Sequence, residues 1–79
     1  MQEIDFCNFD LVVSELKKMG KAFKKYGLAI GIRLIGENTY RLCQNRVDVL
    51  IIKPESSPKY LKLAYIYFRY FIESYNLKY

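Results

Sequence analysis

The spacing of apolar residues changes at Gly27, and this change sets the fold class. Over residues 11–26 seven of the apolar side chains fall within one helical arc of about 140°, at about 100° per residue; they are Leu11, Val12, Leu16, Met19, Ala22, Phe23 and Tyr26. Over residues 28–35 the apolar side chains alternate, which is the spacing of a half-buried strand. The sequence therefore predicts an amphipathic helix, capped by Asn8 or Asp10 and ended by Gly27, followed directly by a strand.

Two further strands are expected after the first one. Gly36-Glu37-Asn38 is a turn signal, and residues 39–44 form the second strand. With a three-residue loop, Leu34 lies opposite Tyr40 and Ile32 opposite Leu42 on the core face. The same register places Arg33 opposite Arg41 on the outer face.

A third strand follows the turn at residues 44–46. Residues 47–53 are apolar on both faces apart from Asp48 and the terminal Lys53, which favours a central or best-covered strand.

A second helix is expected over residues 58–75. Pro54 and the residues after it break the sheet, Ser57 suits the N-cap, and Pro58 suits the first helical position. Its apolar arc exceeds about 200°, more than one sheet face covers. Either the first helix also packs against it, or part of it binds another protein. In the second case we expect an interface, for instance of a homodimer, at Tyr60, Tyr67 and Phe71.

These segments predict one α+β domain over residues 1–79, in the order α-β-β-β-α, with two helices packed on a small antiparallel three-stranded sheet. The chain has 52% hydrophobic and 27% charged residues, as folded domains do. No apolar run is long enough to span a membrane, and the acidic N-terminal segment is unlike a secretory signal. We expect a cytoplasmic protein with Cys7 and Cys43 reduced.

The chain lacks the groups that most catalytic sites need. It has no histidine, the commonest general base and metal ligand. No base is suggested beside either cysteine, and its glycines do not have the spacing of a phosphate-binding loop. We therefore expect a protein that is not an enzyme and uses no cofactor or metal.

Positive charge is concentrated on one side of the first helix. The net charge is +5, and the arc opposite the apolar one carries Lys17, Lys18, Lys21, Lys24 and Lys25. Neighbouring like charges repel at these spacings, and only Glu15 offsets them. Arg33 and Arg41 face each other on the sheet, and Arg46 can extend their patch. These eight residues are the predicted site for a polyanion.

Two partners suit such a surface: a nucleic acid or an acidic protein surface. The segment entering the last helix reads Ser57-Pro58-Lys59-Tyr60-Leu61-Lys62. The order α-β-β-β-α resembles that of double-stranded-RNA-binding domains over most of the chain, with only a partial match to their lysine motif and without their Gly-rich loop. We carry none of their binding residues over. The alternative is a small phage-encoded inhibitor or adaptor of a host protein, similar in size and segment order to some anti-CRISPR proteins.

Overall fold

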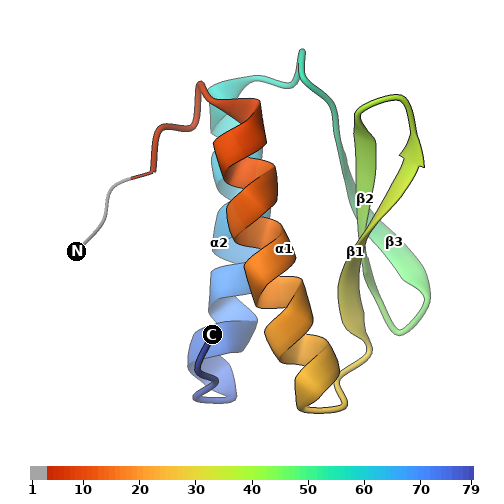
Figure 1. The fold of residues 1–79 in the computed structure, drawn as a ribbon, viewed down its shortest axis with the longest axis vertical. Coiled ribbons are helices and arrows are strands. Elements are labelled where there is room, and N and C mark those ends of the chain that lie inside the picture. Colours follow the sequence, from red (N-terminus) through yellow and green to blue (C-terminus); the bar gives the residue numbers. More distant parts are fainter. Residues whose placement is uncertain (1–3) are drawn as a thin grey trace.

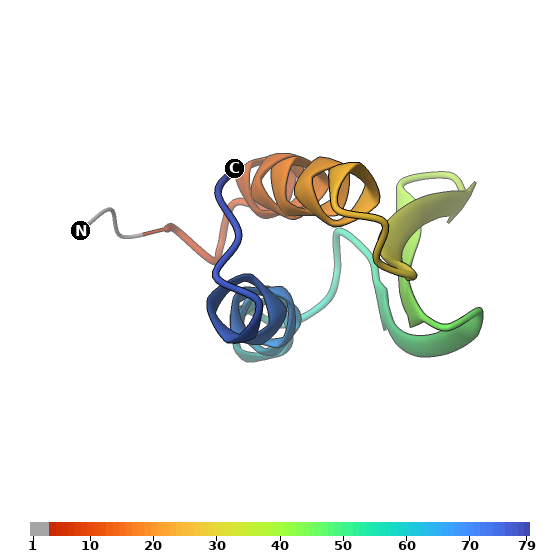
Figure 2. The same cartoon turned by 90° about the horizontal axis from the view of Figure 1, so that it is seen from below.

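The computed structural model describes residues 4–79 and has two layers. The helices α1 (Phe9–Lys25) and α2 (Pro58–Ser74) form one layer. The strands β1 (Ile30–Gly36), β2 (Thr39–Gln44) and β3 (Val47–Ile52) form the other, an antiparallel sheet. Both helices lie on the same side of the sheet, with α1 against β1 and α2 against β3 (Figures 1 and 2). The predicted α+β fold in the order α-β-β-β-α is confirmed.

The helices begin and end where the sequence predicts. The Asn8 side chain accepts a hydrogen bond from the backbone N–H of Leu11, and Gly27 has a φ of +74° after the last turn of α1. At the start of α2, the Ser57 hydroxyl oxygen accepts from the Tyr60 N–H, and Pro58 is the first helical residue. These caps supply partners that the helix ends otherwise lack.

The register of β1 and β2 is also as predicted. Ile32 pairs with Leu42, Arg33 with Arg41, and Leu34 with Tyr40. The turn itself is shorter than expected, because β1 continues to Gly36, which pairs with Thr39. The register shift between Leu34 and Gly36 is a bulge that takes up the extra residue.

The prediction that the third strand is central or well covered is wrong. The strand order is β1-β2-β3, so β3 is an edge strand, and Val47, Val49 and Ile51 are exposed. Two hairpins in succession always place the middle strand of the chain in the middle of the sheet. The apolar content of β3 therefore reflects burial only at Ile52 and in part at Leu50.

The core lies between the two helices and the inner face of the sheet. Phe23 of α1 and Phe68 of α2 are fully buried and meet edge to face, with ring centroids 5.1 Å apart. Leu42 and Ile52 close the core from the sheet. The first helix thus covers part of the wide apolar arc of α2. None of the helices in the described part of the chain is long and apolar enough to cross a membrane.

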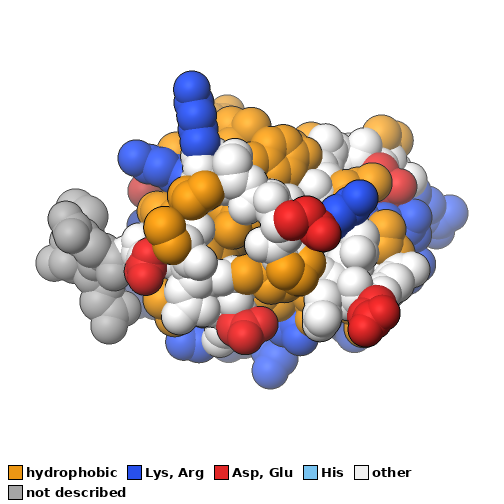
Figure 3. Space-filling view, turned by 90° about the horizontal axis from the view of Figure 1, so that it is seen from above, with side chains coloured by type: hydrophobic (Ala, Val, Ile, Leu, Met, Phe, Trp, Pro, Cys, Tyr) orange, Lys and Arg blue, Asp and Glu red, His pale blue; other side chains and the backbone are white. Residues whose placement is uncertain are grey.

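Three carboxylates lie at one end of the molecule, and two of the predicted cations lie at the other. Asp10 lies in the first turn of α1, Glu37 in the β1–β2 turn and Glu55 in the connection to α2, and these segments share the upper end in Figure 1. Viewed from that end, acidic and apolar side chains spread over the face, and Lys and Arg project mainly at its margins (Figure 3). The last turn of α1 and the β2–β3 turn, with Lys24 and Arg46, lie at the opposite end.

Candidate basic groove

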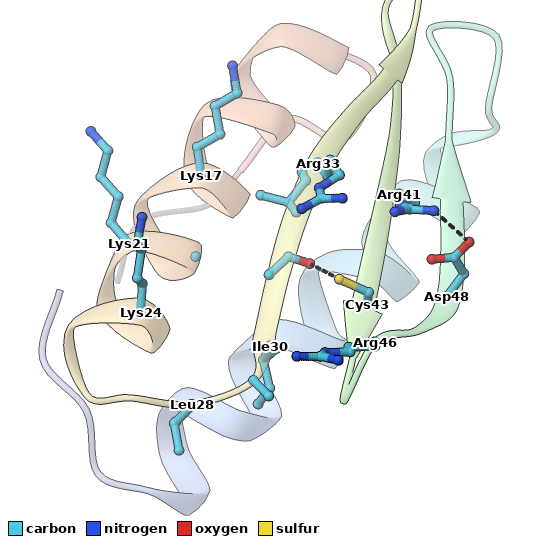
Figure 4. Close-up of a pocket in the computed structure, with 14 residues that line it drawn as sticks. Lys17, Lys21, Lys24, Leu28, Ile30, Arg33, Arg41, Cys43, Arg46 and Asp48 are labelled. Carbon is cyan, nitrogen blue, oxygen red and sulfur yellow. Dashed lines mark hydrogen bonds and ion pairs between the residues drawn. The ribbon is translucent and has the colours of Figure 1, made fainter.

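A groove of about 800 Å³ runs from α1 across β1 to the outer face of β2 and β3 (Figure 4). Six Lys or Arg side chains line it, and among the described residues Asp48 is its one carboxylate. We call this surface the basic groove and define it by its charged residues, Lys17, Lys21, Lys24, Arg33, Arg41, Arg46 and Asp48. It joins two predicted patches that are distant in sequence, the lysine face of α1 and the arginines of the sheet.

The lysines reach the groove because α1 lies close to β1. A Cβ atom at Gly20 would lie 3.3 Å from Cγ2 of Ile32, so this glycine permits the close approach. Lys17, Lys21 and Lys24 follow one another at i, i+4 and i+7 and so share one side of the helix. They project from α1 on one side of the groove, opposite the arginines of the sheet (Figure 4).

Arg33 and Arg41 form the opposite side of the groove. They are directly paired across β1 and β2, so two like charges are adjacent on the outer face of the sheet. One ion pair partly offsets this repulsion, because Nη1 of Arg41 lies 3.2 Å from Oδ2 of Asp48. Nε of Arg41 is shielded from solvent and has no hydrogen-bond partner within residues 4–79. The guanidinium group is thus only partly satisfied by the protein.

Arg46 enters the groove from a strained position in the β2–β3 turn. Asn45 and Arg46 have φ angles of +53° and +68°. Two central residues of positive φ are typical of a type I′ hairpin turn, whose second position favours glycine. A bulky side chain costs about 1–2 kcal/mol in this left-handed region. The sequence therefore keeps a cation at the groove at the expense of stability.

We expect Arg46→Gly to stabilise the protein by about 0.5–1 kcal/mol. Relief of the left-handed strain is partly offset by the greater freedom of glycine in the unfolded chain. Thermal unfolding would show this as a melting temperature higher by about 2–8 °C. Arg46→Ala is the control, because it removes the same charge without relieving the strain. Equal stability of the two variants would contradict this account of the turn.

Gly31 of β1 also lines the groove, on the same face of the strand as Arg33, and was not among the predicted site residues. A Cβ atom there would meet no atom within 4 Å, so the position is open space. Opposite Gly31 in the register is Cys43, whose thiol donates a hydrogen bond to the Gly31 carbonyl oxygen at 3.7 Å. The sequence did offer one signal for this part of the site, a glycine on the outward side of a strand, because such a glycine leaves room for a ligand or another chain.

Two of the eight predicted polyanion-binding residues do not line the groove. Nζ of Lys18 lies 3.0 Å from a carboxylate oxygen of Glu15, one turn back on the same helix. Nζ of Lys25 lies 6.0 Å from the centre of the Tyr26 ring. Both are on the side of α1 that turns away from β1. The structure therefore brings six of the predicted cations together and leaves these two apart.

The residues predicted as a protein interface pack within the protein instead. Phe71 is buried in the core, and Tyr60 and Tyr67 are half-buried against it. The Tyr67 hydroxyl donates a 2.9 Å hydrogen bond to Oε1 of Gln44, and its burial raises the pKa of this phenol. These three residues face α1 and the sheet, so Phe71 offers no surface to a partner and the exposed side of α2 lies elsewhere.

No cluster of His, Cys, Asp and Glu side chains that could hold a metal ion occurs within residues 4–79. Cys7 and Cys43 are both free thiols, in different parts of the fold. Searches against protein-family models, curated proteins and solved structures gave no match to this chain.

Proposed function

We propose that this chain is a non-enzymatic protein that binds the phosphate backbone of a nucleic acid in the basic groove. The observation that carries the proposal is the convergence of six cations from α1, β1, β2 and the β2–β3 turn on one groove, which within residues 4–79 holds a single carboxylate. Lysines supply mobile point charges and arginines planar forks, and both bind phosphate oxygens.

Repulsion within the free protein supports this function. Lys17 and Lys21 are neighbours on one helix face, and Arg33 and Arg41 face each other across two strands. Each arrangement is unfavourable, and it is offset only in part by Asp48 beside Arg41 and by the Tyr40 ring, whose centre lies 5.1 Å from Nζ of Lys17. A row of phosphates lying in the groove would neutralise both pairs of like charges. Binding would therefore remove an electrostatic repulsion that destabilises the free protein.

The chemistry of the groove also indicates what is recognised. Contacts to phosphates fix position on a nucleic acid but carry no direct sequence information. The three lysines of α1 are suited to such contacts and not to forked hydrogen bonds with base edges. We therefore expect binding with little dependence on base sequence.

The test is the salt dependence of binding, measured by fluorescence anisotropy with labelled duplexes of two unrelated sequences and with a single strand. Six phosphate contacts predict a log–log slope of about −5 for duplex DNA and about −4 for a single strand. Between about 50 and 200 mM salt, affinity for the duplex should fall about 1000-fold. Arg46→Gly should reduce the slope by about 1.

Unlabelled poly-glutamate of similar length is the competitor that separates phosphate recognition from general attraction to negative charge. Weak competition by poly-glutamate is expected, because single carboxylates on a flexible chain match the groove less well than a regular row of phosphates. No binding at the lowest salt, an affinity independent of salt, or equal competition by poly-glutamate would overturn the proposal. Equal competition would point to an acidic protein surface as the partner.

A further inference from the structure

Helix α2 exposes an apolar stripe on the side directed away from the core. Leu63, Ile66 and Tyr70 are 51%, 50% and 64% exposed, with Lys59 before them and Glu73 after them. At 100° per residue these five positions fall within about 80° of the helix circumference. We call them the α2 stripe: Lys59, Leu63, Ile66, Tyr70 and Glu73.

The position of the stripe is unusual for the surface of a helix. The buried residues of α2 lie on the opposite side, at Leu61, Ala64, Phe68, Phe71 and Ile72. The side facing solvent directly is where an amphipathic helix carries its charged residues. Here its centre holds three large apolar side chains instead. No residue of α2 lines the basic groove, so the stripe is a separate surface.

We propose that the α2 stripe is the contact surface of a homodimer in which two α2 helices pack antiparallel. The stripe follows the alternating spacing of four and three residues that helices use to pack along their length. Its two ends carry opposite charges, equally distant in sequence from Ile66. A two-fold axis at Ile66 therefore brings Lys59 of each chain opposite Glu73 of the other.

The same axis matches the apolar residues. Leu63 of one chain meets Tyr70 of the other on both sides of the central Ile66 pair, so the seam is apolar in the middle and ion-paired at its ends. A parallel arrangement would instead place Lys59 beside Lys59 and Glu73 beside Glu73, which like-charge repulsion disfavours. The order of charges thus selects a second copy in the antiparallel orientation as the occupant.

The surface beside the stripe adds to the contact area. A groove of about 900 Å³, which Ile66 and Tyr70 also line, holds Phe6, Tyr65 and Tyr79. A stable interface buries about 800 Å² per partner, about one seventh of the 5637 Å² that one chain exposes. The five residues of the α2 stripe alone offer less area than this. Contact that extends into the adjacent groove brings the buried area closer to that of a stable interface. We therefore expect a weak dimer that dissociates in the micromolar range.

Sedimentation equilibrium over the micromolar range tests the dimer. The mass should rise with concentration from 9.4 kDa toward twice that value. Ile66→Glu should keep the protein at 9.4 kDa, since it places two carboxylates together at the centre of the seam. Leu34→Glu is the control and should leave the association unchanged, because Leu34 lies on β1, away from the stripe, and is 58% exposed although the alternation placed it on the core face.

A charge exchange tests the orientation. Lys59→Glu reverses both terminal pairs and should raise the dissociation constant about 10-fold. Adding Glu73→Lys to it should restore the original value, even though Glu73 then loses its 3.3 Å ion pair with Arg69. A monomer at all concentrations, a dimer unaffected by Ile66→Glu, or no recovery in the exchanged variant would overturn the proposal. Circular dichroism of each variant confirms that it is folded.

Discussion

Phe23→Ala is expected to lower the free energy of unfolding by about 3–5 kcal/mol. Phe23 is fully buried, and its ring packs edge to face against both Phe68 and Phe71, at 5.1 and 6.3 Å between centroids. Those two rings lie on α2, so the substitution removes two aromatic contacts between the helices and leaves a cavity. A domain of 79 residues has about 4–12 kcal/mol of stability in total. The variant should therefore lose a large fraction of the stability of the protein.

Thermal unfolding followed by circular dichroism measures this effect. Each kcal/mol corresponds to about 4–8 °C for a domain of this size, so a drop of at least about 12 °C is expected. Phe6→Ala is the matched control, because Phe6 is only half-buried and meets Tyr65 at 5.6 Å outside the centre of the core. A smaller loss of stability for Phe23→Ala than for Phe6→Ala would show that the core is not organised around the Phe23 cluster.

The double variant Lys21→Glu, Lys24→Glu is expected to weaken nucleic-acid binding on the order of 100-fold at low salt. It removes two phosphate contacts and places two carboxylates in the basic groove, which Lys21 and Lys24 line. The log–log salt slope should fall in magnitude by about 2 units. Anisotropy titrations of wild type and variant over the same salt series give both quantities.

The chain offers a control of equal charge for this experiment. Lys18→Glu, Lys25→Glu makes the same two exchanges on the same helix, outside the groove. Each double variant lowers the formal net charge from +5 to +1, since two positive charges become negative. Long-range attraction to a polyanion is therefore reduced similarly in both, and a difference between them reports contacts in the groove. Equal loss of affinity would mean that net charge, not the groove, determines binding.

Most of the fold could be predicted because the ends of the helices are set by residues that are close together in the sequence. Asn8 and Gly27 bound the first helix, and Ser57 and Pro58 start the second, through contacts within a few residues. The register of β1 and β2 also followed from the chain, because alternation fixes which residues face the core. The turn has two residues and not the three that were expected. The bulge at Ile35 takes up the third residue, so the register of the strands is the one predicted.

Features set by tertiary packing were less predictable. The apolar content of β3 favoured a covered strand, but the succession of hairpins made it an edge. On α2, a helix with apolar residues over most of its circumference, periodicity could not tell the buried side from the exposed one. The position of α1 decides this, and it buries Phe71 while leaving Ile66 and Tyr70 in solvent.

The site was predicted in part, for the same reason. Sequence identified the lysine face and the opposed Arg33 and Arg41, but their distance from each other depends on how α1 lies against β1. Gly20, which allows that close approach, lies between the lysines and carries no charge signal. The rotation of α1 then selects Lys17, Lys21 and Lys24 for the groove and leaves the other two lysines outside.

The concentration of positive charge on one surface has a consequence for the way in which a ligand arrives. Six cations converge on the basic groove, which has one carboxylate among the described residues, and the formal net charge of the chain is +5. The field of a polyanion attracts such a protein and turns the groove toward the ligand before the surfaces touch. A larger share of diffusional encounters would then be productive, so this asymmetry of charge acts mainly on the rate of association and less on the lifetime of the complex.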